Sequence, residues 1–353
     1  MNGWMSLDQE PQKRSDLFEI VPPAQWQKPK LSDFLSRFQK QSILILGDLG
    51  VDRYTQGDVE RISPEAPVPI VKVQSERLKL GLAANVADNI SDLGGQCQVV
   101  GIVGEDRSHE DFRTLMEKKK LSTAGLIQDP SRRTVVKERI VSVNQQLLRI
   151  DYETDQPLSE AIERSIIDKV ETLLPTVGAL IIEDYAKGLV TERIAQSAIE
   201  IARANKKLIL VDPNAQSEMS LYHHAGVLTP NLKEAEMLGR KKITDSFKLY
   251  EVGQDLLENA DAQTVIITLG KDGMALFERE REKAIWMPTV AKDVFDVSGA
   301  GDTVIATLTL ALLSGASPCE AAILANCAGG LVVAKPGTAT TSITEIQESL
   351  NRF

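Results

Sequence analysis

Residues 43–46 read Ile-Leu-Ile-Leu, four aliphatic side chains with no polar residue between them. A continuous apolar run of this length is typical of a parallel strand that is buried on both faces of a sheet. Similar runs follow at residues 99–103, 179–182, 208–211 and 265–268. Because the segments between these runs carry helical patterns, the sequence predicts strands and helices that alternate along the chain.

One of the intervening helices has a clear apolar face. Its apolar residues recur at helical spacing: Leu82, Val86, Ile90 and Leu93. The glycine pair at 94–95 then supplies a helix stop. Repeated strand–helix units with right-handed crossovers predict an α/β fold with a doubly wound, mostly parallel sheet flanked by helices.

Two stretches lack helices and predict a second, smaller sheet. Residues 56–73 and 133–152 are rich in strand-forming or alternating patterns. Prolines at positions 64, 67 and 69 suit an edge strand, because proline has no backbone N–H to donate. We expect a small antiparallel lid with strands within about 55–75 and 132–152, of the kind that covers a site or forms a dimer surface.

The rest of the chain limits the domain organisation and the compartment. Residues 1–40 carry several prolines and no sustained hydrophobic period, which predicts a partly disordered N-terminal extension, and residues 41–353 predict one α/β domain. The first residues lack the basic and apolar segments of a secretory signal. The longest uncharged run, 303–319, is shorter than the roughly 18–20 residues of a membrane span. We therefore expect a cytoplasmic protein.

The charge balance argues against nucleic-acid and membrane partners. The chain has 40 Lys and Arg against 50 Asp and Glu, a net charge of −10. Binding to a phosphate backbone or an anionic membrane needs a clustered excess of Lys and Arg, so we expect neither partner. Three cysteines without a Cys-x-x-Cys pair, and three histidines, predict neither a disulfide framework nor a zinc site.

The motif with the most chemistry lies near the C-terminus. Residues 296–303 read Asp-Val-Ser-Gly-Ala-Gly-Asp-Thr and precede an apolar helix. Small residues at Gly299, Ala300 and Gly301 let backbone N–H groups converge at a helix N-terminus, which favours an anion such as phosphate. Asp302 then lies in the first helical turn. A carboxylate there also has a purely structural explanation, because the helix dipole favours it and it can cap free N–H groups.

This motif resembles the C-terminal signature of the ribokinase-like (PfkB) carbohydrate kinases, and the resemblance extends from residue 43 to the C-terminus. It implies a ribokinase-like fold, with ATP and Mg²⁺ as cofactors. In that family the last Asp of the signature is the general base and the glycine turn is the anion hole. The resemblance therefore implies that Asp302 is the base and that Gly299, Ala300 and Gly301 hold the transferring phosphoryl group. Asp296 is the implied candidate ligand of a monovalent cation such as K⁺.

Further motifs of that family mark a nucleotide site. Residues 231–234, Asn-Leu-Lys-Glu, match its Asn-x-x-Glu, and residues 268–273, Thr-Leu-Gly-Lys-Asp-Gly, match its nucleotide loop. The implied nucleotide-site residues are Thr268, Gly270, Gly273, Asn326 and Gly330, with Asn231 and Glu234 ordering Mg²⁺ and phosphate through water.

Three stretches narrow the resemblance to the heptose-7-phosphate 1-kinases: residues 47–54, 57–69 and 144–151. The string at 62–69, Ile-Ser-Pro-Glu-Ala-Pro-Val-Pro, is long and unusual. It implies phosphorylation of the C1 hydroxyl of D-glycero-D-manno-heptose 7-phosphate, in ADP-heptose synthesis for lipopolysaccharide. Some heptose kinases carry a fused nucleotidyltransferase domain; the sequence has no room for one before Phe353, so we expect any adenylylation to need a separate protein.

The substrate site is expected at strand ends and on the lid. Asp52 follows the first strand and Asn85 opens the next helix, which makes them candidates for binding sugar hydroxyls. The candidates for the 7-phosphate and its neighbourhood are Arg61, Lys137, Arg139 and Arg149 on the lid, and Asp184 and Lys187 in a loop that resembles a family loop near the phosphates. Each also has a plain alternative, as a turn former, a helix N-terminal residue or a solvated strand residue.

Four positions depart from the pattern of these kinases. Leu82 and Ala186 replace glycines, and the second change is modest if φ there is negative. Asn214 and Val143 stand where a lysine and an arginine are usual, so each removes a charge that could balance phosphate.

Two alternatives remain open: a ribokinase-like kinase for another sugar or sugar phosphate, and a non-catalytic regulator that binds sugar or nucleotide. Retention of Asp302 and its glycine turn argues against the regulator. The resemblance and the exposed strand edges of the lid predict a homodimer.

Overall fold

The computed structural model describes residues 16–142, 145–154, 156–291 and 293–353, and within them ten strands form one large sheet. The strands, in their order across the sheet, are β1 (Phe18–Ile20), β14 (Ala284–Met287), β13 (Met274–Glu278), β12 (Thr264–Thr268), β11 (Val227–Leu228), β10 (Leu208–Asp212), β9 (Ala179–Glu183), β2 (Ser42–Gly47), β5 (Gln96–Val103) and β6 (Leu126–Gln128). All neighbours pair in parallel except β13, which is antiparallel to β12 and to β14.

The predicted mostly parallel sheet is confirmed, and the apolar runs explain it. The five runs identified in the sequence form β2, β5, β9, β10 and β12. In β2 the side chains alternate between faces: Ile43 and Ile45 pack into one core, and Leu44 and Leu46 into the other. All four are fully buried, so both faces must be covered by helices.

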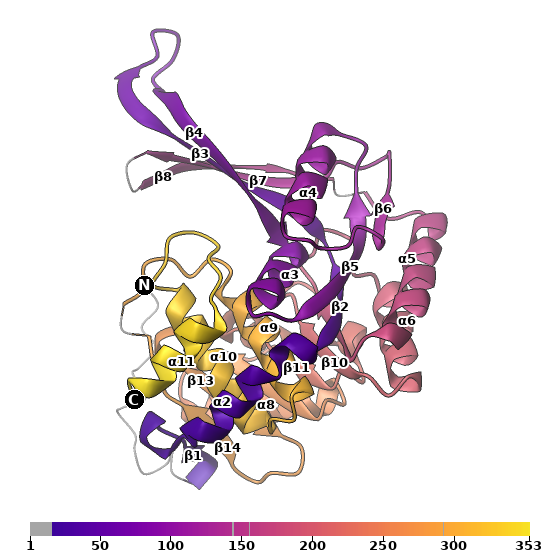
Figure 1. The fold of residues 1–353 in the computed structure, drawn as a ribbon, viewed down its shortest axis with the longest axis vertical. Helices are drawn as coiled ribbons and strands as arrows, with labels where there is room; N and C mark the ends of the chain where they lie inside the picture. Colours follow the sequence, from indigo (N-terminus) through magenta and orange to yellow (C-terminus); the bar gives the residue numbers. More distant parts are fainter. Residues whose placement is uncertain (1–15, 143–144, 155, 292) are drawn as a thin grey trace.

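Helices cover the two faces of this sheet in two sets (Figure 1). The core beside Ile43 and Ile45 includes α2 (Lys28–Ser36), α3 (Ala83–Asp92), α4 (Arg107–Lys118), α9 (Ala300–Leu313), α10 (Pro318–Val332) and α11 (Ile343–Asn351). The opposite core includes α5 (Glu160–Leu173), α6 (Glu192–Ala204), α7 (Leu232–Leu238) and α8 (Ser246–Asn259). None of the described helices has the length and apolar character needed to cross a bilayer.

The described part of the N-terminal segment, residues 16–40, packs against the domain, whereas the sequence analysis predicted a partly disordered extension over residues 1–40. Strand β1 extends the sheet, and Phe18 makes edge-to-face contacts with Phe277 and Trp286. Helix α2 is followed by a 3₁₀ turn and buries three of its apolar side chains. The segment is ordered because these few apolar residues enter the two cores, although the polar residues between them mask any period. Residues 1–15 lie outside the described part of the chain.

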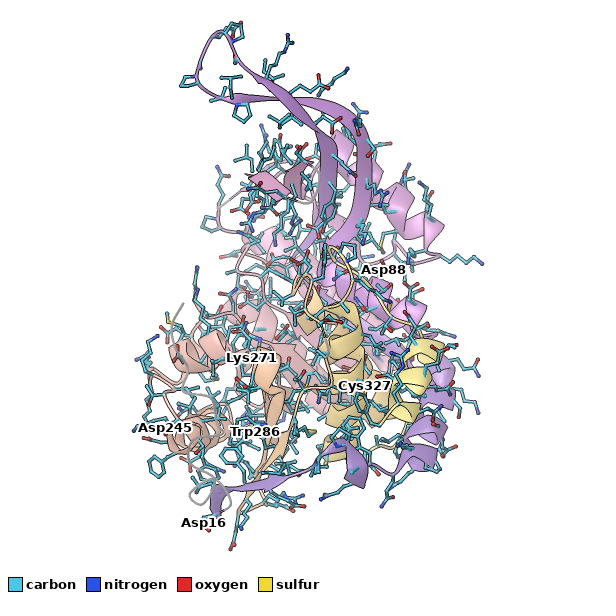
Figure 2. All side chains as sticks on the ribbon, turned by 90° about the vertical axis from the view of Figure 1, so that its left-hand side faces the viewer. Asp16, Asp88, Asp245, Lys271, Trp286 and Cys327 are labelled. Atoms are coloured by element: carbon cyan, nitrogen blue, oxygen red, sulfur yellow. The ribbon has the colours of Figure 1, made fainter. Side chains whose placement is uncertain are left out.

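The predicted lid is present as a four-stranded sheet that stands away from the body (Figures 1 and 2). It consists of two antiparallel hairpins, β3 (Leu49–Ile62) with β4 (Pro69–Leu82), and β7 (Val135–Ser142) with β8 (Gln145–Tyr152). Strands β3 and β7 join the hairpins and pair in parallel, a detail that the expected antiparallel lid did not include. Pro69 begins β4, which is an edge strand as the prolines predicted.

The β3–β4 hairpin of the lid joins the body through very short connections. Only Asp48 separates β2 from β3, and β4 runs directly into α3. At the second junction Leu82 adopts φ 58° and ψ −141°, a backbone region that glycine favours and other residues rarely enter. Its side chain is nevertheless buried, and a Cβ on Gly50 would lie 2.8 Å from the Leu82 Cδ1 atom. Tight packing at the root of the lid therefore holds a residue in a strained conformation of order 1–3 kcal/mol.

Candidate functional site

The first turn of α9 holds the carboxylate that the sequence motif singled out. Gly299 caps this helix with φ 76°, a left-handed conformation, and a Cβ there would come within 2.9 Å of the Asn85 Nδ2 atom. Asp302 is only 6% exposed. Its Oδ1 atom accepts a hydrogen bond of 2.6 Å from the Tyr185 hydroxyl, and its Oδ2 atom accepts one from the Asn85 amide. The structure thus brings together two of the candidate site residues, Asp302 and Asn85.

The turn before Asp302 retains a free backbone donor. The Ala300 N–H donates to the Val297 carbonyl at 3.3 Å. Within the described residues, no acceptor bonds the Gly301 N–H, which lies in the first helical turn. A free N–H at the positive end of a helix suits an anion, so the turn retains part of the predicted anion hole.

The environment of Asp302 tunes its protonation. Burial raises the pKa of this carboxyl to about 6, against the opposing effect of the hydrogen bonds from Tyr185 and Asn85. The negative charge of Asp52 adds to the rise, and the positive charge of Lys137 reduces it. The group is therefore ionised at neutral pH, and its pKa is close enough to neutrality for efficient proton transfer.

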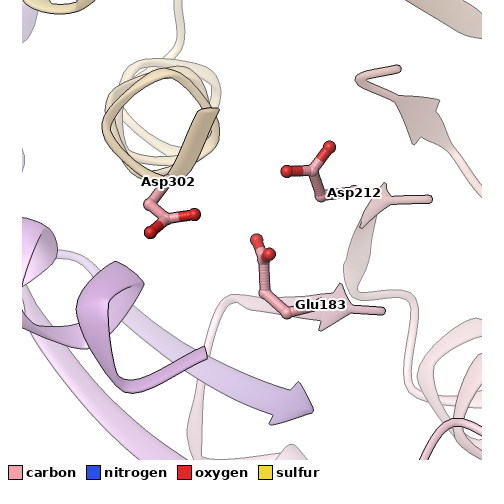
Figure 3. Close-up of side chains that lie close together, drawn as sticks. All are labelled: Glu183, Asp212 and Asp302. Carbon is pink, nitrogen blue, oxygen red and sulfur yellow. The ribbon is translucent and has the colours of Figure 1, made fainter. Parts of the chain in front are cut away.

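Two acidic residues that the sequence analysis did not select lie beside Asp302. Glu183 is the last residue of β9 and Asp212 the last of β10, neighbouring parallel strands. One carboxylate oxygen of each lies within 4.8 Å of the others and of Asp302, and the three side chains point toward a common space (Figure 3). We call Glu183, Asp212 and Asp302 the acidic cluster. A signal existed in the sequence, because two apolar runs each end in an acidic residue and parallel strands end at one edge.

Lid residues form the other side of the site. In the parallel pairing of β3 and β7, Asp52 lies opposite Lys137 and Tyr54 opposite Arg139. Arg139 Nη1 lies 2.7 Å from Asp52 Oδ1, and Lys137 Nζ lies 5.0 Å from the centre of the Tyr185 ring. The structure therefore brings three predicted substrate residues, Asp52, Lys137 and Arg139, close to the group that holds Asp302.

Two other predicted lid cations lie further out. Arg149 is opposite Arg139 on β8, half-exposed, and pairs with Asp151 at 2.9 Å. Arg61 is exposed near the tip of the β3–β4 hairpin. Arg61 lies nine positions beyond Asp52 along the strand, a rise of roughly 30 Å at about 3.3 Å per residue. Within one protomer, Arg61 is therefore not gathered with the other candidates, because the sequence pattern identified a strand but not how far that strand extends.

The predicted loop after β9 is held by one hydrogen bond of its own and by bonds to the segment at residues 217–222. Asp184 accepts bonds from the Ala186 N–H and from the hydroxyls of Ser217 and Tyr222, which is the turn-forming alternative stated for it. Lys187 lies close by and its Nζ atom pairs with Glu153 at 2.7 Å. Neither side chain is free of protein partners in this conformation.

The Asn-x-x-Glu motif begins helix α7. Asn231 and Glu234 form a capping box: Asn231 Oδ1 accepts from the Glu234 N–H, and Glu234 Oε2 accepts from the Asn231 N–H at 2.8 Å. Burial raises the pKa of Glu234, and the charge of Glu234 in turn raises the pKa of buried Asp212 after burial itself. The motif is thus adjacent to the acidic cluster, with hard oxygen donors that suit Mg²⁺.

Several predicted nucleotide residues lie beside the segment that follows β14. Thr268 forms a β-bridge with Asn231, which places the nucleotide loop beside the Asn-x-x-Glu motif. Gly270 and Gly273 have φ of 59° and 92°, and a Cβ on Gly273 would collide with the Met287 carbonyl oxygen.

The opposite side of this segment faces α10. Asn326 donates a hydrogen bond of 2.7 Å to the Pro288 carbonyl. A Cβ on Gly330 would lie 3.2 Å from the Ala291 nitrogen. Three of the five nucleotide candidates, Gly273, Asn326 and Gly330, therefore lie against residues 287–291, although they come from distant parts of the sequence.

Asp296 is held in a loop rather than in the acidic cluster. It accepts hydrogen bonds from the backbone N–H groups of Ser298 at 2.9 Å and Gly337 at 3.0 Å. Burial alone would raise the pKa of Asp296, but these hydrogen bonds outweigh it and the pKa falls. The carboxylate stays charged, which suits its predicted role beside a monovalent cation.

Three other positions depart from the pattern of the heptose kinases, and the structure describes two of them, Ala186 and Asn214. The replacement of glycine by Ala186 was expected to be modest if φ there is negative. Its φ is 52°, so alanine occupies a left-handed position that favours glycine, and that expectation is wrong. Asn214 builds a turn, accepting from the Gln216 N–H at 2.9 Å. Val143 and Asn144 lie outside the described residues.

Comparison with known proteins agrees with this arrangement. The family model described as pfkB family carbohydrate kinase matches residues 40–345. The bifunctional protein HldE of Aliarcobacter butzleri is 40% identical over 310 residues, which cover 88% of this chain and 64% of that protein. The HldE protein of Desulfatibacillum aliphaticivorans is 40% identical over 316 residues, 90% of this chain and 64% of that protein. This chain therefore spans about two-thirds of the length of these relatives.

Solved structures share the fold. Phosphofructokinase-2 from Escherichia coli in complex with potassium has a TM-score of 0.73 at 19% identity, with 88% of this chain and 98% of that chain covered. Ribokinase from Arabidopsis thaliana, complexed with ribose and ATP, has a TM-score of 0.67 at 18% identity, with 88% and 98% covered. The predicted ribokinase-like fold is confirmed. Because the family model matches nearly the whole α/β domain around the Asp302 site, this chain belongs to the pfkB family of carbohydrate kinases.

Proposed function

We propose that this kinase transfers the γ-phosphoryl group of ATP to the C1 hydroxyl of D-glycero-D-manno-heptose 7-phosphate, in the cytoplasm, on the path to ADP-heptose. The observation that carries the proposal is the pairing of a buried carboxylate with lid cations: Lys137 and Arg139 lie on the side of Asp302 that faces the lid. A substrate that already carries a phosphate needs such cations. Relatives that are 40% identical carry the single name HldE, and the 62–69 string of the lid resembles heptose kinases.

In this mechanism Asp302 accepts the proton of the C1 hydroxyl while that oxygen attacks the γ-phosphorus. A new P–O bond forms at C1, the bond to the β-phosphate oxygen breaks, and ADP leaves. Asn85 and Tyr185 hold the carboxylate in place, and the Gly301 N–H donates to the transferring phosphoryl group. Asp52 binds a sugar hydroxyl, while Lys137 and Arg139 bind the 7-phosphate.

The nucleotide would bind beside residues 287–291, between the Thr268–Gly273 loop and α10. Asn231 and Glu234 would hold Mg²⁺ through water, and this ion would neutralise phosphate charge. One carboxylate oxygen of Glu234 caps α7. The negative charge of Glu234 raises the pKa of Asp212, which indicates that Glu234 lies near the acidic cluster, where a cation would be favoured. Asp296, in the neighbouring loop, would hold a K⁺ ion if one binds there.

An ADP-release assay tests the substrate. We expect heptose 7-phosphate to be preferred over the unphosphorylated heptose and over pentose and hexose phosphates, and ³¹P NMR to place the new phosphate on C1. Preference for an unphosphorylated sugar would assign the chain to the alternative, a kinase for another acceptor. Tight binding of sugar or nucleotide without ADP production would assign it to the regulator.

The hydroxyl of Tyr185 is expected to set the acid limb of the pH profile. The pKa of Asp302 is about 6, so at lower pH this carboxyl is protonated and cannot accept a proton. We therefore expect kcat/KM to fall about tenfold per pH unit below that pKa. The Tyr185 hydrogen bond lowers that pKa, so Tyr185→Phe raises it and moves the acid limb to higher pH, by about one unit.

The substrate phosphate titrates in the same range, so the comparison with the unmodified enzyme on the same substrate isolates the protein group. Tyr250→Phe is the matched control, because its hydroxyl bonds the Glu282 carbonyl elsewhere. An acid limb at the same pH in Tyr185→Phe and in the unmodified enzyme would refute this role of Tyr185.

We also propose a homodimer through the lid. Its edge strands β4 and β8 are unpaired on one side in the described chain, and apolar side chains on the lid are exposed. The most exposed are Ile62 at 60%, Leu148 at 56%, Val68 at 51% and Val73 at 51%. Such a surface is stabilised when a second copy covers it.

Light scattering tests the dimer. The 38.7 kDa chain should have twice that mass in solution, and Ile62→Lys with Leu148→Lys should reduce it to the monomer. Phe247→Lys, an exposed apolar residue on α8 with 58% exposure, is the control and should leave the dimer intact. A monomeric unmodified protein at micromolar concentration would contradict the proposal.

A further inference from the structure

The loop that carries Tyr185 has a backbone that local preference does not favour. Ala186 and Gly188 have φ of 52° and 97°, both positive, and alanine enters the left-handed region only at an energetic cost. Tyr185 directly precedes them, and its hydroxyl donates the bond of 2.6 Å to Asp302. Contacts from outside the loop are therefore needed to fix the position of this tyrosine.

Asp48 supplies two of these contacts from the root of the lid. It is 5% exposed, and each of its carboxylate oxygens accepts from a different N–H of the loop: Oδ2 from Lys187 at 3.0 Å and Oδ1 from Leu189 at 3.1 Å. Asp48 is also the only residue between β2 and β3. The loop is therefore bonded directly to the point where the β3–β4 hairpin begins.

Arg132 holds the same loop through its carbonyl side. Its Nη2 atom donates to the Lys187 carbonyl at 2.8 Å and to the Thr154 carbonyl at 2.9 Å, and its Nη1 atom donates to the Gln156 carbonyl. Arg132 precedes β7, and residues 154 and 156 follow β8, so this guanidinium ties the loop to the ends of the β7–β8 hairpin. The N–H and the carbonyl of Lys187 are thus held by two opposite charges, one beside each hairpin of the lid.

We infer that Asp48 and Arg132 are positioning residues for the phosphoryl transfer. They transmit the position of the lid to the Tyr185 hydroxyl and, through it, to the carboxylate of Asp302. The inference rests on the proposed role of Asp302 as the base. It adds a connection between the lid and that base that does not pass through Asn85.

The test compares the acid limb of the kcat/KM profile in Asp48→Asn and in the unmodified full chain. Asparagine offers one acceptor oxygen in place of two, so its amide group faces a loop N–H and one bond is lost. The Tyr185 bond, which lowers the pKa of Asp302, should then weaken, and the acid limb should move to higher pH by up to about one unit. Arg132→Lys should act alike, because an ammonium group cannot reproduce the planar fork that bonds three carbonyls.

The double variant Asp48→Asn/Tyr185→Phe separates positioning from general damage. Without the tyrosine hydroxyl Asp48 has nothing to position, so the acid limb of the double variant should coincide with that of Tyr185→Phe alone. The other groups that face Asp302 are the same in all of these proteins: Asn85, Asp52, Lys137, Glu183 and Asp212.

The direction of the shift excludes a direct titration of Asp48. Burial raises the pKa of Asp48 to about 6, with Asp184 adding to the rise and Arg132 opposing it. Asparagine does not titrate, so if the ionisation of Asp48 itself produced the acid limb, Asp48→Asn would move that limb to lower pH. The inference requires a shift to higher pH.

Asp129→Asn is the matched control. Asp129 is nearly as buried as Asp48, at 6% exposure, but the bonds from the Ser131 N–H and hydroxyl both end on its Oδ1 atom, which asparagine retains. Its acid limb should therefore match that of the unmodified protein. Amide hydrogen exchange gives a readout without turnover: the Lys187 and Leu189 amides should exchange faster in Asp48→Asn and at the normal rate in Asp129→Asn.

Three outcomes would overturn the inference. One is an unmoved acid limb in Asp48→Asn beside a shifted limb in Tyr185→Phe, which would leave the role of Tyr185 intact. Another is a further shift in the double variant, because Asp48 would then act on Asp302 by a different route. The third is no shift in either single variant, which would also remove Tyr185 from its role. Each assay uses the acceptor that the ADP-release measurement identifies, so a sugar other than heptose 7-phosphate would change the proposed function and leave this test valid.

Discussion

Replacement of Asp302 by Asn should lower kcat by roughly 10²–10⁴-fold while changing the KM for ATP and for sugar little. Asparagine has nearly the same shape and can still contact Asn85 and Tyr185, but it cannot accept the proton of the attacking hydroxyl. The loss should therefore appear in the chemical step, which a single-turnover ADP-release measurement isolates.

The control for this variant is Asp245→Asn. Asp245 caps α8, and asparagine is an equally good N-cap, so neither stability nor kcat should change. Near-normal turnover in Asp302→Asn would remove the residue from its role as base, and the helix-capping explanation of this aspartate would stand.

Replacement of Lys137 by Met should raise the KM for heptose 7-phosphate about ten- to a hundredfold, and change kcat less. Methionine keeps an apolar stem of similar length but removes the charge, and a hydrogen bond to a charged group contributes about 1.5–3 kcal/mol. Burial lowers the pKa of Lys137, and no carboxylate lies within ion-pair distance of it among the described residues. The ammonium group is therefore available to a phosphate.

Arg149→Met serves as the comparison for Lys137. Arg149 lies further out on the lid and is already paired with Asp151, so its loss should raise this KM by much less. The unphosphorylated heptose supplies a second control when it is assayed well above pH 6, where Asp302 is ionised in both proteins, since Lys137→Met should then leave its weak turnover unchanged. An unaltered KM for the phosphorylated sugar in Lys137→Met would exclude contact between this lysine and the 7-phosphate.

The sequence was most informative where one local pattern carries the structure. The strand at residues 43–46 is predictable because both faces of a central strand are apolar, so burial leaves its mark on every residue. The placement of Asp302 is predictable because a short glycine-rich turn determines the start of its helix.

Contacts between distant segments were harder to predict. Glu183 and Asp212 meet because two parallel strands end side by side, and nothing local in either segment records which strands are neighbours. Tyr185 lies between Asp184 and Lys187, in the loop that the sequence analysis identified. Its hydrogen bond to Asp302 could not be predicted, because it depends on how that loop turns toward α9. Arg61 illustrates the opposite error: its residue type suited a phosphate, but the length of β3 carries it away from the site.

The short connections at the root of the lid have a mechanical consequence. Asp48, the only residue between β2 and β3, accepts hydrogen bonds from the backbone of Lys187 and Leu189 at 3.0 and 3.1 Å. At the other connection Leu82 is already in a strained conformation and leads at once into the helix that carries Asn85. Because neither connection contains extra residues, a rotation of the β3–β4 hairpin would also move α3. Asn85 on α3 bonds Asp302, so the orientation of Asp302 depends on the position of the hairpin.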